Sequence, residues 1–134
     1  MKPIFLTFLK FSASSTVTLL KVLLALMVPA QAQLVPDSSV GTINNSGNIT
    51  GGMLTTNGTQ QNLFHSFQEF SLSSTETATF FAPNSVENII TRVTGQIPSK
   101  IHGTLQVANT TSNLFLINPA GIVFGPTAQL RIED

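Results

Sequence analysis

The stretch Ile101-His-Gly-Thr-Leu-Gln-Val107 decides the fold class, because an apolar residue or glycine occupies every second position. A period of two places these side chains on one face of a β-strand. The alternation recurs in Ala128-x-Leu130-x-Ile132 and, more briefly, in Phe70-x-Leu72. Asn113-Leu-Phe-Leu-Ile117 is a continuous apolar run, which is typical of a strand covered on both faces. The sequence therefore predicts an all-β protein.

The composition around these stretches also disfavours helices. Asn, Ser and Thr make up 34 of the 102 residues from position 33 onward, and all nine glycines lie there. These residue types favour turns and compete with helical hydrogen bonds. The segment 63–70 has phenylalanine at every third position, which fits one face of a short helix or a bent strand. We favour the strand, because Phe70-Ser-Leu72 continues with a period of two.

Two weak internal repeats point to a repetitive β architecture. Val93-Thr-Gly95 and the strand after it resemble Val123-Phe-Gly125 and the strand after that, at an offset of 29–30 residues. Asn62-Leu-Phe64 recurs as Asn113-Leu-Phe115. Strand, glycine turn and strand repeated at such spacing indicate a solenoid or propeller. An ordinary β-sandwich with similar strands is the alternative.

The first 32 residues have the features of a secretory signal peptide. They carry three lysines and no acidic residue, followed by the apolar run 22–28 and Pro29-Ala-Gln-Ala32. Small residues at Ala30 and Ala32 predict cleavage after Ala32. The apolar run is much shorter than the ~20 residues of a membrane span. We therefore predict a helical signal peptide over 1–32 and one domain over 33–134, with an uncleaved anchor as the alternative.

Charge and cysteine content exclude several classes of protein. The chain has no cysteine, which excludes a disulfide scaffold, a thiol nucleophile and cysteine-ligated metal sites. Residues 33–134 carry three basic and six acidic side chains, so their net charge is −3. The basic residues are scattered, and we expect no nucleic-acid partner.

No catalytic site is predicted. His65, Ser66 and Glu69 have the residue types of a hydrolase site. Neighbouring residues on a strand point to opposite faces, however, so Ser66 and His65 would not meet as nucleophile and base. A packed histidine is the favoured interpretation of His65. The acidic residues are isolated, so the clustered carboxylates of a polysaccharide-active enzyme are missing, and no cofactor or metal site is expected.

Four motifs in fixed order then carry a resemblance to a known family. They are Asn62-Leu-Phe-His-Ser-Phe-Gln-Glu-Phe-Ser-Leu72, Asn88-Ile-Ile-Thr-Arg-Val-Thr-Gly95, Ser99-x-Ile101-x-Gly103-x-Leu105 and Asn113-Leu-Phe-Leu-Ile-Asn-Pro-Ala-Gly-Ile-Val-Phe-Gly125. From about Gly41 onward the chain resembles the N-terminal secretion domain of filamentous-haemagglutinin-like exoproteins of bacterial two-partner secretion. The first motif resembles its form in cyanobacterial members.

The resemblance implies a fold and a partner. The implied fold is a right-handed parallel β-helix, here with few rungs, preceded by an N-terminal cap and carrying short hairpins. The implied function is non-enzymatic. The domain leaves the cytoplasm through the Sec machinery, is recognised by periplasmic domains of an outer-membrane β-barrel transporter, and carries a surface adhesin out of the cell. We therefore expect a secreted or cell-surface protein that passes through the periplasm.

The resemblance also nominates residues for transporter recognition or turn formation. One block supplies Asn62, Leu63, Phe64, His65, Phe67 and Phe70. The other supplies Asn118, Pro119 and Gly121, which match the family's Asn-Pro-Asn-Gly turn. Ala120 departs from that turn, because the family usually has asparagine there.

Family members continue beyond the position of Asp134, so we expect this chain to be a fragment of a longer exoprotein. Carbohydrate on a host or cell surface would then be bound by the missing passenger. Two other functions stay open at this point. One is a free-standing secreted β-helix adhesin or carbohydrate-binding surface protein, and the other is a polysaccharide-active β-helix enzyme.

Overall fold

The structure, a computed structural model, describes residues 33–108 and 111–132. These residues form strands and no helix, which confirms the all-β prediction for this part of the chain. The predicted signal peptide and its cleavage site at Ala30 and Ala32 lie outside the described residues. Within the described ranges, no helix has the length and apolar character needed to span a membrane.

The strands follow one another with short connections. In chain order they are β1 (Leu34–Pro36), β2 (Thr42–Asn45), β3 (Asn48–Gly51), β4 (Met53–Asn57), β5 (Gln60–Phe70), β6 (Thr77–Phe81), β7 (Val86–Val93), β8 (Ser99–Ile101), β9 (Thr104–Ala108), β10 (Asn113–Ile117), β11 (Ile122–Phe124) and β12 (Gln129–Arg131).

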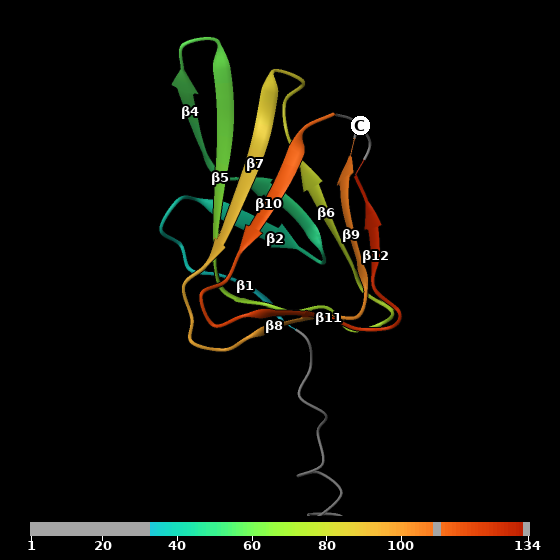
Figure 1. Cartoon of the computed structure of the whole chain (residues 1–134). Coiled ribbons are helices and arrows are strands. Elements are labelled where there is room, and N and C mark those ends of the chain that lie inside the picture. Colours follow the sequence, from blue (N-terminus) through green and yellow to red (C-terminus); the bar gives the residue numbers. More distant parts are fainter. Residues whose placement is uncertain (1–32, 109–110, 133–134) are drawn as a thin grey trace, which may run out of the picture. The chain divides into compact units, whose positions relative to one another are not determined.

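Three sheets collect these strands in a repeating order (Figure 1). Sheet A has the order β1-β5-β7-β10, with β4 also paired to β5; sheet B has β12-β9-β6-β3-β2; sheet C pairs β11 with β8. The chain therefore visits sheets A, C and B in turn, and we call each circuit a pass. The first pass runs through β5, Leu72 and β6, because Leu72 bridges to Ile101 of β8. The second pass is β7-β8-β9 and the third is β10-β11-β12.

Pairing between passes is parallel, whereas β1, β2 and β4 join their neighbours antiparallel. In sheet A, Asn62 lies opposite Asn88, which lies opposite Asn113. The repeat of Asn62-Leu-Phe64 at Asn113-Leu-Phe115 is thus real, but it spans two passes with Asn88-Ile-Ile90 between them.

The other repeat is wrong in its register. Ser99–Ile101 pairs with Ile122–Phe124, and Leu105 pairs with Leu130, so corresponding residues lie closer in sequence than the expected 29–30. The two glycine turns are not equivalent positions, because the corners between strands differ in length from pass to pass.

A single core lies between the sheets. Sheet A contributes Leu63, Phe67 and Ile89, while sheet B contributes Phe80 and Leu105. The phenyl rings of Phe67 and Phe70 meet edge to face with centroids 5.0 Å apart, and Phe70 stacks on Phe80 at 6.1 Å. Edge-to-face and offset ring pairs of this kind stabilise a core beyond their apolar area.

The alternation that decided the fold class is confirmed. Ile101, Gly103, Leu105 and Val107 are all buried, although a corner at His102 and Gly103 divides the stretch into β8 and β9. A Cβ at Gly103 would lie 2.2 Å from the backbone oxygen of Glu76. This corner therefore packs directly on the corner of the pass before it, and only glycine leaves room for that contact.

Two details of the strand prediction come out differently. The strand interpretation of residues 63–70 is confirmed by β5, but the phenylalanines do not share a face: Phe67 and Phe70 are buried, whereas Phe64 is only partly buried. A register shift opposite Val35 and Pro36 breaks the period of two in this segment. Asn113–Ile117 is not covered on both faces, because Phe115 and Ile117 of β10 are about half exposed.

Candidate functional site

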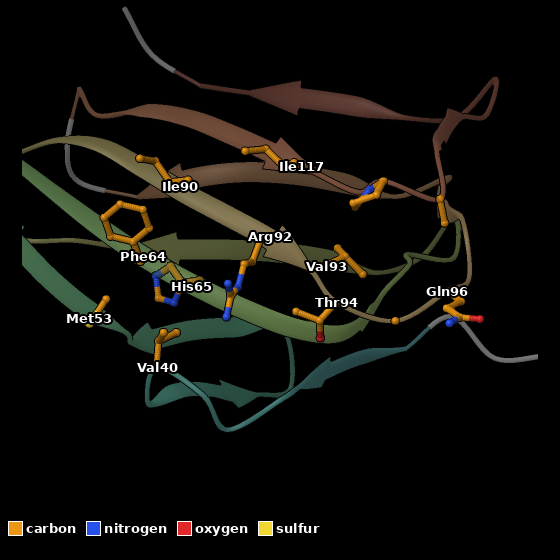
Figure 2. Close-up of a pocket in the computed structure, with 13 residues that line it drawn as sticks. Val40, Met53, Phe64, His65, Ile90, Arg92, Val93, Thr94, Gln96 and Ile117 are labelled. Atoms are coloured by element: carbon orange, nitrogen blue, oxygen red, sulfur yellow. The ribbon is translucent and has the colours of Figure 1, made fainter.

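A groove of about 970 Å³ lies where several strands of sheet A meet the segment before β2 (Figure 2). Its lining comes from four strands and three loops. Most of the apolar lining is supplied by Val40, Met53, Phe64, Ile90, Ile117 and Pro119. In this view Arg92 lies between Phe64 on one side and the polar Thr94 and Gln96 on the other. Apolar grooves with a few placed polar groups are the usual form of a binding site.

The groove brings together two segments that the sequence nominated separately. Phe64 and His65 come from the first block, whereas Pro119 and Ala120 come from the turn after β10. More than fifty residues separate the two segments in the chain. They meet because parallel pairing stacks β5, β7 and β10 side by side in sheet A.

The nominated residues of β5 divide between its two faces. Leu63, His65, Phe67 and Phe70 are buried in the core, at exposed fractions of at most 4%. Asn62 and Phe64 are partly exposed, and Phe64 stands opposite Ile90, which stands opposite Phe115. The outer face of sheet A therefore carries an apolar row that begins in the groove at Phe64 and Ile90 and continues to Phe115.

Next to that row runs an asparagine ladder. The Asn88 side-chain amide donates to Asn62 Oδ1 at 2.9 Å, and the Asn113 amide donates to Asn88 Oδ1 at 3.0 Å. Each hydrogen bond joins residues that are also register partners. The ladder thus ties the same position of three passes together.

The Asn118 side chain is mostly buried and forms hydrogen bonds within the protein. Its amide donates to the Ile97 carbonyl at 3.0 Å and to Ser99 Oγ at 2.9 Å, while Oδ1 accepts from Ala120 N at 2.9 Å. Gly121 closes the turn by donating to the Asn118 carbonyl at 3.0 Å, with φ at 111°. A φ of this sign favours glycine. The turn leaves Pro119 exposed at the mouth of the groove.

A carboxylate network holds the segment before β2 against sheet A. Asp37 Oδ2 accepts from Ser66 Oγ at 2.5 Å and from Thr94 Oγ1 at 2.9 Å. Oδ1 accepts from the nitrogen and the hydroxyl of Ser39 at 3.0 and 2.7 Å. Burial alone would raise the pKa of this carboxyl, but the hydrogen bonds from Ser66, Ser39 and Thr94 hold it well below its usual range.

Arg92 is attached to this network through serines. Its Nε donates to Ser66 Oγ at 3.0 Å, and Nη2 donates to Ser39 Oγ at 3.4 Å. Both serines donate in turn to Asp37. The guanidinium is therefore oriented at the groove by hydroxyl groups rather than by direct contact with the carboxylate.

His65 is a packed core histidine, as the sequence analysis favoured. It is 1% exposed, its ring lies 5.5 Å from that of Phe80, and neither ring nitrogen has a hydrogen-bond partner. Burial lowers its pKa to about 4, so the ring is neutral near pH 7. Thr91, its register partner on β7, also has a buried hydroxyl without a partner.

The described residues contain no group of three or more histidine or acidic side chains that could hold a metal ion. Ser66 and His65 are adjacent in the sequence, but their side chains have different partners. Ser66 forms a hydrogen bond with Asp37, while His65 packs against Phe80. The arrangement is suited to binding through apolar contact and one guanidinium.

Sequence reasoning missed several residues of this site. Asp37, Val40 and Met53 lie in the segment before the matched motifs, and Arg92 lies inside one without any assigned role. The Asn62 and Asn113 repeat carried a usable signal, because Asn88 occupies the middle of that interval.

The model of the TPS secretion domain family matches residues 32–134, which is most of the chain. No curated protein and no solved structure matches the chain significantly.

Proposed function

The chain belongs to the TPS secretion domain family, and on that premise we propose that its groove is recognised by the periplasmic domains of an outer-membrane two-partner-secretion transporter. The exported protein would be a surface adhesin or haemagglutinin-like exoprotein. The observation that carries the proposal is the meeting of the two nominated segments, 62–70 and 118–121, at one groove.

The nominated residues take different roles in this proposal. Phe64 and Pro119 contact the transporter, because both line the groove and both are at least partly exposed. Asn118 and Gly121 shape the turn that presents Pro119. Asn62 aligns the strands through the ladder, whereas Leu63, His65, Phe67 and Phe70 act through the core.

The proposed fold is a right-handed parallel β-helix with residues 33–52 as its N-terminal cap. The support is the order of the strands, since three successive passes visit the same three sheets in the same order and pair with one another in parallel. The extra hairpin is formed by β4 and the first half of β5. A crystal structure in which the passes wind with the opposite hand would contradict this assignment.

The proposed route begins with residues 1–32 as a signal peptide for the Sec machinery and continues with residues 33–134 as the secretion domain. The lysines, the apolar run and the small residues Ala30 and Ala32 support it. N-terminal sequencing of exported protein should begin at Gln33. Full-length protein retained with its first residue intact would contradict cleavage.

The test of recognition is direct binding of the purified protein to the periplasmic domains of its cognate outer-membrane transporter. Phe64→Ser and Pro119→Ser should each weaken binding about tenfold, because each removes apolar contact from the groove. Phe124→Ser is the matched control, since Phe124 is half exposed on β11 in another sheet. Equal losses in all three variants would contradict recognition at the groove.

A further inference from the structure

The described lining of the groove carries positive charge and no negative charge. Among the described lining residues, Arg92 is the single charged side chain at neutral pH, because burial keeps His65 neutral. The apolar lining extends on both sides of it, from Met53 and Phe64 to Ile117 and Pro119. A ligand that fills this groove must therefore match an apolar surface with one positive charge inside it.

The guanidinium of Arg92 is held in place but has capacity left for a ligand. Two of its five N–H donors are used in the hydrogen bonds to Ser66 and Ser39. Asp37 accepts four hydrogen bonds from hydroxyl and backbone donors, which fills the acceptor sites of a carboxylate. The Asp37 carboxylate is thus saturated by neutral donors. The remaining N–H groups of the Arg92 guanidinium are available to a carboxylate of the ligand.

We infer that the groove binds an extended segment of the partner in which a glutamate or aspartate stands between apolar side chains, with its carboxylate on Arg92. This inference rests on the proposed function, in that the segment belongs to the periplasmic domains of the transporter. Arginine pairs with a carboxylate through two parallel hydrogen bonds, which gives both strength and orientation. The flanking apolar side chains fill the space beside Phe64 and Ile117.

Charge complementarity favours this occupant over a segment of the same chain. Residues 1–32 are apolar, but they carry three lysines and no acid, so they would place like charge beside Arg92. Residues 33–134 have a net charge of −3, so long-range repulsion disfavours an acidic partner. The preference for an acidic segment must therefore come from the short-range pair between the Arg92 guanidinium and the carboxylate of the ligand. The prediction is for this reason specific to Arg92.

The experiment titrates the purified protein with three short peptides: acetyl-Ile-Thr-Glu-Ile-Thr-amide and the same sequence with glutamine or lysine in the middle. Binding is followed by NMR shifts of labelled protein. The glutamate peptide should bind about tenfold more tightly than the glutamine peptide, as expected for a hydrogen-bonded charge pair. That preference should disappear in Arg92→Gln and persist in Arg131→Gln, a matched loss of charge on sheet B.

Urea denaturation of both variants checks that each remains folded, and Arg92→Lys tests whether the planar fork matters beyond its charge. A peptide of residues 60–72 serves as a further control, since an isolated strand cannot form the groove. Equal binding of the glutamate and glutamine peptides would overturn the inference, as would an Arg131→Gln effect equal to that of Arg92→Gln.

The same variants separate this inference from the proposed function. If the periplasmic domains bind the protein but Arg92→Gln binds them equally well, recognition stands and the acidic segment is wrong. If the glutamate preference holds but the periplasmic domains do not bind at all, the groove has the inferred chemistry and the transporter is not its partner.

Discussion

The second and third passes use similar strands in the same sheets, but their side chains differ in burial. Leu105 and Ile101 of the second pass are 2% and 0% exposed, whereas their register partners Leu130 and Phe124 are 59% and 52% exposed. Within the described residues, β9 and β8 have neighbours from both adjacent passes, while β12 and β11 have a neighbour on one side. Burial in this fold therefore depends on stacking between passes more than on the residue itself.

The largest expected effect compares the two leucines directly. Leu105→Ala should lower the free energy of unfolding by about 3 kcal/mol, because it leaves a cavity in a packed core. Leu130→Ala should cost less than about 1 kcal/mol, because most of that side chain is already in solvent. Urea denaturation of both variants gives the comparison, and equal losses would contradict the difference between the passes.

A glycine pair tests the corners in the same way. Gly103→Ala should cost about 2–3 kcal/mol, because its Cβ would collide with the backbone of Glu76 in the pass before it. Gly121→Ala should cost only about 1 kcal/mol, since a Cβ there meets open space and only the positive φ is strained. Thermal and urea unfolding would rank the two, and the reverse order would refute close stacking of the corners.

His65 should make the stability of the first pass depend on pH. The folded protein keeps His65 neutral down to about pH 4, whereas the unfolded chain takes up a proton near pH 6.5. The free energy of unfolding should therefore fall as the pH drops, by about 2 kcal/mol between pH 7 and pH 5. His65→Leu should flatten this slope, and an unchanged slope in that variant would assign the effect elsewhere.

The smallest effect concerns the asparagine ladder. Asn88→Ala should cost about 1 kcal/mol more than Asn113→Ala, because Asn88 takes part in two ladder hydrogen bonds and Asn113 in one. Asn62→Ala also loses one ladder bond and serves as the control. Similar unfolding curves for all three variants would mean that solvent replaces the ladder without loss.

Much of the strand pattern could be predicted from the sequence, because alternation is a local property. The burial of Ile101, Leu105 and Val107 followed from a period of two, and the strand over 63–70 followed from Phe70-Ser-Leu72. The exposure of Phe115 and Ile117 could not be predicted in this way, because it depends on which strands lie beside β10. A run of apolar residues in the sequence shows which side chains are hydrophobic, but it does not show which other strands will cover them.

The site was predictable only in part, for a related reason. Its two motif segments were nominated by resemblance, but their meeting depends on the register of β5, β7 and β10. The network of Asp37, Ser66 and Arg92 joins residues 26 to 29 positions apart. In a chain so rich in serine and threonine, no local pattern marks the three hydroxyl groups that the network uses.

The asparagine ladder also has a direction. Each amide nitrogen donates toward the preceding pass, from Asn113 to Asn88 and from Asn88 to Asn62, so the side-chain dipoles align and polarise one another. The two ends of the ladder are therefore chemically unlike. Asn62 presents its side-chain NH2 group, a donor, and Asn113 presents its side-chain carbonyl oxygen, an acceptor. A hydroxyl, amide or ammonium group arriving at the Asn113 end would extend the row, whereas a carboxylate there would be repelled.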